Sequence, residues 1–447
     1  MSEDAPAIAP PSGRSPYAPA SAPTRLADAQ RALVGLWSFW RAQRVQWGDP
    51  EKLRAWQAKR LGAMVRHAYA TVPFYRRLYD QERVDPTAIR SLDDLARLPV
   101  ITKAQLQAEP EEDLLSRSRR KESLVTALTS GSSGRPFRTY RDPGVERWRA
   151  GFLLRALATA GYRLGDHLMI VVERPERPGT GWTRWRKLTF HDQPEFVLSE
   201  INRLRPTIVY GYVSALRQVV RLAQEQGRPV HQPKAVVTVS ETLDPITRQM
   251  LTDGFGAPVF DIYGSIEMGV IAWECTAHRG YHVAEDSVLV ETEPAEQGGH
   301  RLLLTNLHNM AMPLIRYDQA DLAVLGDGAP CPCGRRLRCL EAIQGRVMDS
   351  ILRPDGSHIP PFTITSVIRE IPGLRRFQIV QERPELLTAR VESDGPLDAE
   401  VETRVAQELA EVLGPDMRIV TEAVATLEPP PGVKFRLIES RLGRSGG

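Results

Sequence analysis

The sequence predicts an α/β fold, with a large N-terminal domain of mainly parallel strands and helices that includes an antiparallel subdomain, and a small mobile C-terminal α+β domain. Short apolar runs alternate with helix-like segments between residues 124 and 263, a pattern typical of βαβ units. From about residue 287, extended runs separated by glycine-containing turns indicate antiparallel strands. The chain has 447 residues, which is enough for two domains or more.

Composition narrows the class of protein. Charged residues make up 25% of the chain, hydrophobic residues 42%, and the net charge of +3 is spread too thinly to indicate a nucleic-acid partner. No apolar run is long enough to cross a bilayer, and residues 1–22, rich in proline, alanine and serine, predict a disordered tail without the features of a signal peptide. Four cysteines do not form a secreted disulfide framework, so we expect a cytoplasmic protein.

The elements follow in chain order. Residues 26–79 predict helices whose many tryptophans pack against the same domain or, alternatively, against a membrane or a partner. A helix is expected from Val213 to Gln226. The expected parallel strands are Leu168–Val172, Thr207–Gly211, Ala235–Val239 and Pro258–Tyr263.

The second half of the chain predicts shorter units. Antiparallel strands are expected at 288–292, 301–306 and 314–325. After Gly345-Arg346 we expect strands at 377–381 and 388–392, a helix at 399–413 and a final extended run at 419–424. These patterns divide the chain into the tail at 1–22, an N-terminal domain at 23–346 and a C-terminal domain at 347–447.

Polar residues and glycines gather where the predicted parallel strands end, in the segments 210–214, 240–242 and 263–267. Ligands of open α/β sheets bind beyond the carboxyl ends of the strands, so these segments together predict a binding site. Any one of them alone is also compatible with a turn and a helix cap.

The segment Thr129–Pro136 has a composition suited to anion binding. Its two glycines let backbone N–H groups approach a ligand, its hydroxyls donate hydrogen bonds, and its arginine adds a fixed charge. A plain flexible loop is the alternative. The spacing differs from the GxxxxGK[ST] loop, and the residues concerned are Thr129, Ser130, Gly131, Ser132, Ser133, Gly134 and Arg135.

In order and spacing, five motifs resemble those of the adenylate-forming acyl- and aryl-CoA ligases. The resemblance is to the phenylacetate–CoA ligase branch, with its CapK-like capsule-biosynthesis and coenzyme F390 synthetase-like relatives, and it spans residues 61–441. The motifs are Thr129–Pro136, Tyr263-Gly-Ser-Ile-Glu267, Leu314-Ile-Arg-Tyr-Asp-Gln-Ala-Asp321, Gly345-Arg346 with Asp349, and Gly432-Val-Lys434.

The resemblance implies that the N-terminal domain is an adenylation domain. ATP and a carboxylic acid would form an acyl-adenylate and pyrophosphate, and a thiol, most simply that of CoA, would then take the acyl group. Residues 129–135 would hold the β- and γ-phosphates, Glu267 would hold Mg²⁺, and Asp321 would accept both ribose hydroxyls. Tyr263 would pack on the adenine, with Gly264 letting the ring approach.

The resemblance also implies roles near the end of the chain. Arg346 would contact the ribose or the phosphates, Lys434 would approach the α-phosphate and the carboxylate oxygen, and Asp349 would lie at a hinge on which the C-terminal domain moves. Catalytic candidates are Lys434, Glu267 and Arg346. Further cofactor-binding candidates are Glu241 and Ser265, and substrate-binding candidates are Tyr210, Gly211, Tyr212, Ser214 and Ile262.

Three positions depart from the family pattern. Arg135 stands where many relatives have lysine, Ala320 replaces the glycine before the aspartate and crowds the backbone, and Val433 is inserted in the terminal motif. These departures leave open a catalytically weak, nucleotide-binding homologue in cell-surface polysaccharide biosynthesis. The aromatic N-terminal helix leaves open a membrane-associated assembly factor for cell-surface polysaccharide. Transfer of the acyl group to a carrier protein, an amine or a hydroxyl, and a homodimer, are also open. We expect a small-molecule carboxylic acid as substrate.

The cysteines suggest a metal site. Cys331-Pro-Cys333-Gly334 forms a tight turn, and Cys275 lies near His282 in the sequence. Together Cys275, His282, Cys331 and Cys333 predict a Cys₃His structural zinc site, with Cys339 as a spare ligand. Free cytosolic thiols are the alternative, because a Cys-x-Cys pair is a weaker signal than Cys-x-x-Cys.

Overall fold

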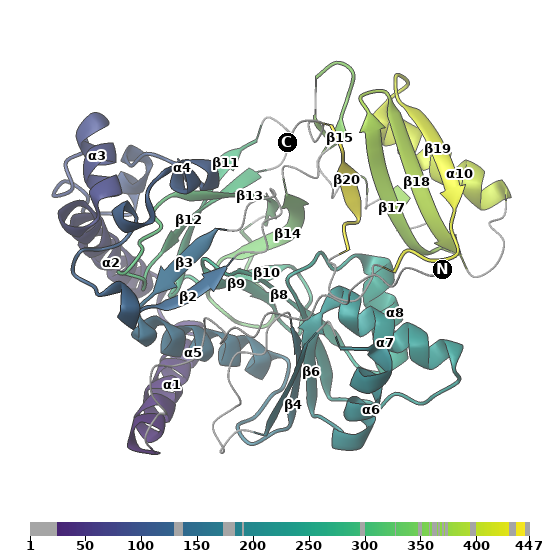
Figure 1. Ribbon diagram of the computed structural model, residues 1–447, viewed down its shortest axis with the longest axis horizontal. Coiled ribbons are helices and arrows are strands. Elements are labelled where there is room, and N and C mark those ends of the chain that lie inside the picture. The colour runs from purple at the N-terminus through teal and green to yellow at the C-terminus, as the bar shows by residue number, and fades with distance from the viewer. Residues whose placement is uncertain are drawn as a thin grey trace, which may run out of the picture.

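The computed structural model describes most of the chain (Figure 1). The described residues are 25–128, 137–172, 184–189, 192–295, 300–326, 328–346, 351–356, 358–359, 364, 367–368, 371, 374–393, 399–428 and 435–442, without the side chains of 25–34, 344, 346 and 358. The tail at 1–22, the whole phosphate-binding segment at 129–136, Asp349 and the terminal motif at 432–434 therefore lie outside the described residues.

The N-terminal helices are α1 (Arg25–Val45), α2 (Pro50–Thr71) and α3 (Pro73–Gln81). Helix α2 begins where the Asp49 carboxylate accepts a hydrogen bond from the Glu51 N–H, with a proline in the first turn. Helix α1 packs closely on α5 (Pro143–Thr159), because a Cβ atom at Gly151 would lie 2.5 Å from Ser38 Oγ. Only a residue without a Cβ atom at 151 allows the two helices to come this close. The helices expected in residues 26–79 are present.

Small elements connect these helices to the sheet. They are η1 (Asp93–Arg97), β1 (Ile101–Thr102), α4 (Lys103–Ala108), η2 (Glu111–Asp113), η3 (Lys121–Ser123), and the hairpin of β2 (Val125–Leu128) with β3 (Arg138–Arg141). The α4 helix starts with a capping box between Thr102 and Gln105.

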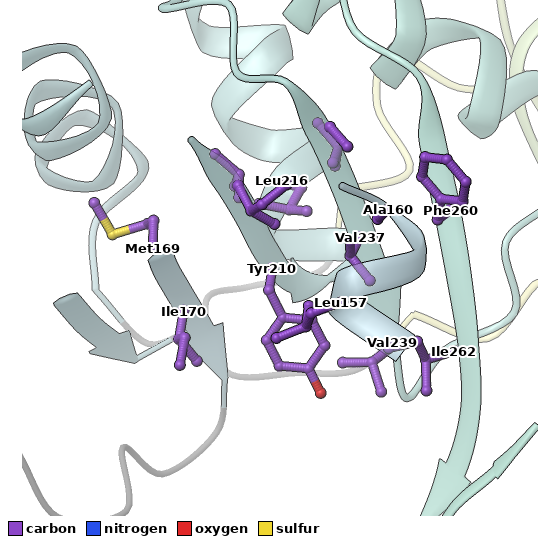
Figure 2. Close-up of a cluster of buried hydrophobic side chains, with 14 of the residues drawn as sticks. Leu157, Ala160, Met169, Ile170, Tyr210, Leu216, Val237, Val239, Phe260 and Ile262 are labelled. Carbon is purple, nitrogen blue, oxygen red and sulfur yellow. The ribbon is translucent and has the colours of Figure 1, made fainter. Parts of the chain in front are cut away.

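The parallel half of the main sheet has the order β8-β7-β6-β4-β5. Leu157 of α5 and Tyr210 of β6 belong to the hydrophobic core of this half (Figure 2). The expected βαβ arrangement is confirmed, and the strands expected at 168–172 and 235–239 have the predicted bounds. The strands are β4 (Leu168–Val172), β5 (Trp185–Thr189), β6 (Ile208–Tyr212), β7 (Ala235–Val239) and β8 (Val259–Ser265), and the helices are α6 (Pro194–Leu204), α7 (Val213–Glu225) and α8 (Pro245–Phe255).

The antiparallel half continues the same sheet in the order β9-β10-β14-β13-β12-β11, with β1 parallel to β13. The expected strand from Leu314 begins only at Tyr317, because Arg316 has a φ of 48° and interrupts the extended backbone. The strands are β9 (Gly269–Glu274), β10 (Tyr281–Val283), β11 (Val288–Pro294), β12 (His300–Asn306), β13 (Tyr317–Leu325) and β14 (Cys339–Arg346).

The C-terminal part has its own sheet, in the order β19-β18-β17-β20, and its own hydrophobic core. Helix α10 has the predicted bounds. The domain boundary at 346/347 itself stays a prediction. The elements are β15 (Ile351–Leu352), β16 (His358–Ile359), β17 (Leu374–Arg383), β18 (Leu386–Ser393), α10 (Ala399–Leu413), β19 (Arg418–Ala423) and β20 (Ile438–Ser440).

Ion pairs join α7 to the C-terminal part. Arg217, 1% exposed, donates from Nε to Glu428 Oε1 at 2.6 Å, and Arg376 Nη1 lies 2.8 Å from Glu428 Oε2. Arg221 Nη1 donates to Glu392 Oε1 at 2.7 Å. We call these five side chains the interdomain ion-pair network. Burial makes their pairing strongly dependent on the present position of the C-terminal part.

Across the described ranges, no helix combines the length and apolarity that a membrane span requires.

Candidate active site and metal centre

Tyr263 and Asp321 meet where the two halves of the sheet join. Tyr263, near the end of β8, donates from its hydroxyl to Asp321 Oδ2 at 2.6 Å, although 58 residues separate the two in the chain. Gln319 Nε2 donates to the same oxygen at 2.6 Å. On the other side, Asp321 is the backbone partner of Arg346 in the β13–β14 pairing. Residues from three predicted motifs therefore lie together: Arg346 pairs with Asp321 in the sheet, and Tyr263 reaches the Asp321 side chain from β8.

A bulge in β13 directs Asp321 toward this junction. Gln319, Ala320 and Asp321 lie between Asp318 and Leu322, whose partners on β12 are separated by a single residue, so β13 carries two extra residues at this bulge. Ala320 has a φ of 61°, and its N–H donates to Asp318 Oδ1 at 2.8 Å. We expected Ala320 to crowd the backbone, but the structure gives a different reason for glycine here: the position needs a left-handed backbone, which alanine adopts only with strain.

Glu267 lies in the turn between β8 and β9 and is 8% exposed. Its Oε1 is 3.5 Å from the hydroxyl of Tyr317. The turn is tight: Ser265 Oγ accepts from the Met268 N–H at 3.1 Å, and a Cβ at Gly264 would lie 2.6 Å from the Gly269 carbonyl oxygen. Ser265 thus shapes the turn that holds Glu267, and glycine at 264 is required by the close approach of β9.

The predicted phosphate-binding segment is the connection between β2 and β3, whose last described pair is Leu128 with Arg138. At the other end of β3, Arg141 donates from Nη1 to the Ile266 carbonyl at 3.2 Å and from Nε to Glu146 at 2.5 Å. The hairpin that carries the segment is therefore attached to the turn that carries Glu267.

The strand-end residues have specific structural partners. Glu241 accepts from the N–H of Ser214 at 2.7 Å and from its hydroxyl at 3.0 Å, which satisfies the start of α7. Tyr210 and Ile262 belong to the buried cluster of Figure 2, and Tyr212 is 8% exposed. Gly211 lies within β6, where a Cβ would be 2.9 Å from the Val171 carbonyl oxygen. Their predicted roles in cofactor or substrate binding stay predictions.

Phe435 and Arg436, the residues after Lys434, are held on β17. The Arg376 guanidinium lies 3.5 Å from the centre of the Phe435 ring, and Gln378 Nε2 donates to the Arg436 carbonyl at 3.0 Å. The segment that follows Lys434 is therefore tied to the C-terminal sheet. Roles for Lys434 and Asp349, and for the Arg346 side chain, lie outside the described residues.

The four predicted zinc ligands form a cluster. One ligand atom from each of Cys275, His282, Cys331 and Cys333 lies within 4.8 Å of all the others. Cys275 Sγ is 3.6 Å from Cys331 Sγ, and Cys333 Sγ is 3.2 Å from His282 Nε2. A tetrahedral zinc ion with Zn–S bonds of about 2.3 Å places neighbouring sulfur atoms about 3.8 Å apart, so the cluster suits such an ion.

Strand pairing brings this cluster together. His282 on β10 pairs directly with Trp273 on β9 and with Cys339 on β14, and Cys275 follows β9. The turn at 331–334 is closed by a hydrogen bond from the Gly334 N–H to the Cys331 carbonyl at 3.0 Å. Cys339 lies on the other side of the imidazole, with Sγ 3.2 Å from Nδ1, outside the four-residue cluster.

Burial dominates the electrostatics of the cluster. It raises the pKa of the Cys275 thiol to about 12 and lowers the pKa of His282 to about 4. Burial alone would also raise the pKa of Cys333, but hydrogen bonds from the backbone and side chain of Arg335 hold it below its usual value. A neutral imidazole and one readily ionised thiol are suitable metal ligands.

Sequence reasoning assigned no role to several residues around these sites. Tyr317 and Gln319 belong to the 314–321 motif, but only the structure shows that Tyr317 approaches Glu267 and that Gln319, in the bulge, contacts Asp321. Arg335 directly follows the Cys-x-Cys turn and donates to Gln46 and Thr159. Its position in the sequence, two residues after Cys333, could have indicated a contact with the cysteine cluster. Arg141 carried no sequence signal.

The fold is that of the adenylate-forming acyl-CoA ligases. A 2-hydroxyisobutyryl-CoA ligase in the postadenylation state, in complex with R3-HIB-AMP, has a TM-score of 0.76 and 21% identity, covering 89% of this chain and 92% of that one. The same ligase with 2-HIB-AMP and CoA in the thioesterification state has a TM-score of 0.61 and 21% identity, covering 90% and 92%.

Sequence comparison identifies the family. The phenylacetate–coenzyme A ligase of Thermus thermophilus is 30% identical over 405 residues, which cover 82% of this chain and 84% of the relative. The CapK C-terminal domain family matches residues 351–441. The chain belongs to the phenylacetate–CoA ligase family of adenylate-forming enzymes, as its motifs predicted.

Proposed function

We propose that this protein activates a carboxylic acid with ATP, releases pyrophosphate, and transfers the acyl group from the acyl-adenylate to the thiol of CoA. It is an AMP-forming acid–thiol ligase. The observation that carries the proposal is the contact of Tyr263 with Asp321, beside the turn that holds Glu267 and the hairpin that carries residues 129–136. Separate motifs with nucleotide-binding chemistry thus converge on one place in the fold.

The residues have complementary roles in this reaction. Asp321 accepts the two ribose hydroxyls, and its contacts with Tyr263 and Gln319 fix the carboxylate before the nucleotide binds. Residues 129–135 hold the phosphates, while Arg346 and Lys434 offset the charge that gathers as a carboxylate approaches the α-phosphate. Alignment of two anionic reactants is the main contribution of such a site.

Mg²⁺ fits Glu267, because this cation prefers one or two carboxylates together with phosphate oxygens, and the Glu267 carboxylate is the buried acid of the turn. The ion would neutralise phosphate charge during adenylation. Zinc fits the cluster of Cys275, His282, Cys331 and Cys333, with His282 binding through Nε2 and oriented by Cys339 at Nδ1. That ion would be structural and would tie the end of β9 to the turn before β14.

The C-terminal domain is proposed to move between the two half-reactions. Support comes from the two states of the 2-hydroxyisobutyryl-CoA ligase, whose TM-scores against this structure are 0.76 and 0.61. Asp349 is proposed as the hinge. Replacing it with proline should impair thioester formation more than adenylation, and equal losses would contradict the hinge.

Pyrophosphate release tests the proposal. The protein is incubated with ATP and Mg²⁺ and a panel of aryl, acyl and amino acids, with and without CoA. We expect release that depends on one acid and falls at least a hundredfold in Glu267→Gln, while Glu341→Gln, an exposed glutamate on β14, keeps the parent rate. Release that is independent of any acid, or ATP binding without release, would favour the catalytically weak homologue.

A further inference from the structure

The first helix presents tryptophan to solvent. Trp37, Trp40 and Trp47 are 54%, 59% and 47% exposed, and among the described residues no other tryptophan is as exposed. Large aromatic side chains contribute much free energy when buried, so three of them exposed within eleven residues are unusual for a surface that contacts only water.

These side chains share one face. At 100° per residue, positions 37, 40 and 44 lie within about 60° of one another around the helix axis, and Trp47 follows in the turn after α1. The opposite face of the helix is buried: Ser38 and Ala42 are both fully covered, and Ser38 Oγ donates to the Arg147 carbonyl at 2.9 Å. We call Trp37, Trp40, Arg44 and Trp47 the tryptophan stripe.

The stripe rests on a rigid base. The Arg41 guanidinium lies 5.9 Å, 5.1 Å and 5.4 Å from the ring centres of Trp37, Trp56 and Trp148, and Trp37 also packs edge-on against Trp148 at 5.2 Å. Arg335 lies 4.8 Å from the centre of the Trp47 ring. Cations thus lie against the indoles of Trp37 and Trp47, and these contacts reduce the side-chain freedom that the two rings would lose when their exposed edges are covered.

Charge separates the candidate partners. The described side chains of residues 35–60 include six basic and two acidic groups, a net +4, whereas the whole chain carries +3. A second copy of this surface would meet it with the same strong positive charge. An anionic bilayer offers opposite charge, and its headgroup layer is where tryptophan rings are most favourably placed.

We propose that the tryptophan stripe and the surrounding basic residues form a peripheral docking surface for an anionic lipid bilayer. Figure 1 shows α1 at the lower left of the molecule, on the side away from β17, β18 and α10. Docking through α1 therefore leaves the C-terminal part away from the lipid. The surface is separate from the ligase site, so the proposal does not depend on the reaction.

Vesicle flotation of the full chain tests this surface. Vesicles of phosphatidylcholine with one third phosphatidylglycerol are compared with vesicles of phosphatidylcholine alone, at low salt and at 0.5 M NaCl. We expect binding to the anionic vesicles that falls at least tenfold at high salt, because screening shortens the reach of the charges. A blue shift of tryptophan emission and quenching by brominated lipid should accompany it.

Variants locate the surface. Trp37→Gln/Trp40→Gln/Trp47→Gln should lower the partition coefficient at least tenfold, and Arg44→Glu should lower it several-fold. Phe196→Gln, an aromatic residue 44% exposed on α6, is the matched control and should bind as the parent does. Circular dichroism and acid-dependent pyrophosphate release check that each variant is folded, and they are independent of lipid.

Three outcomes would overturn the proposal. They are absence of binding to anionic vesicles at low salt, binding that survives the triple substitution, and binding that Phe196→Gln removes equally. A concentration-dependent dimer that the triple substitution dissociates would assign the stripe to self-association instead.

Discussion

Neutralising Glu428 should uncouple the two half-reactions. Glu428 pairs with Arg217 at 2.6 Å and Arg376 at 2.8 Å, and its side chain is 13% exposed while the arginines are 1% and 3% exposed. Glu428→Gln keeps the shape but leaves two buried guanidinium groups without their main counter-charge. Removing one partner of a buried pair destabilises the arrangement by about 3 kcal/mol.

That free energy acts on the position of the C-terminal domain, because the network joins α7 to β17, to β18 and to the segment after β19. In an arrangement where α7 separates from these segments, Arg217 reaches water and the substitution costs less. A shift of about 3 kcal/mol changes the ratio of two arrangements roughly a hundredfold. We therefore expect the ratio of thioester formation to adenylation to rise between tenfold and a hundredfold.

Single-turnover kinetics measure the two steps separately, as pyrophosphate release without CoA and as consumption of preformed adenylate after CoA is added. Glu422→Gln is the matched control, since Glu422 is 51% exposed and pairs with Arg390 inside the C-terminal sheet. It should leave both rates within about twofold, as expected for an exposed pair. If Glu428→Gln changes both half-reactions by the same factor, the network has no part in the movement and the reasoning is wrong.

Three further predictions concern stability and metal content. Ala320→Gly should raise the free energy of unfolding by up to about 1 kcal/mol in urea denaturation, because glycine adopts the φ of 61° without strain; a loss of stability would contradict this. Mass spectrometry of the metal should find one zinc ion per chain in the purified protein. The ion should be lost in Cys331→Ser and kept in Cys339→Ser, and the opposite result would show that the ligands are misassigned. Burial next to Glu274 raises the pKa of Asp261 from 3.8 to about 6, so the stability it contributes is complete below pH 3.8 and is lost as the pH rises through 6. The free energy of unfolding of Asp261→Asn, measured in denaturant titrations, should therefore rise relative to that of the parent by up to about 3 kcal/mol between pH 4 and pH 7. A difference that does not vary with pH would refute the pKa shift.

The parallel half of the fold was predictable because its strands are continuous apolar runs. Leu168–Val172 and Ala235–Val239 are buried on both faces, and their composition alone sets their bounds. The start of β13 was not predictable. The residues before Arg316 are as apolar as those of a strand, but the backbone turns at Arg316 and the strand begins only after it. Local composition carries no record of such a turn.

The candidate site followed from motifs rather than from contacts. The motif pattern grouped Tyr263 with Asp321 by function, and strand pairing brings the two side chains together. The contact of Gln319 with Asp321 depends on a bulge with two extra residues, which results from pairing with β12 and leaves no periodic signal in the sequence. The Cys₃His cluster was predictable because only one residue separates Cys331 from Cys333, whereas the position of Cys339 behind His282 depends on the register of β10 and β14.

Detection of the acyl-adenylate itself tests the central claim most directly. The protein is mixed without CoA with ATP, Mg²⁺ and the acid that supports pyrophosphate release, and the quenched mixture is analysed by mass spectrometry. The account predicts a burst of acyl-AMP equal to the enzyme concentration, which is replaced by acyl-CoA and AMP when CoA is added. Pyrophosphate release with no acyl-AMP, or ADP and phosphate as products, would contradict it.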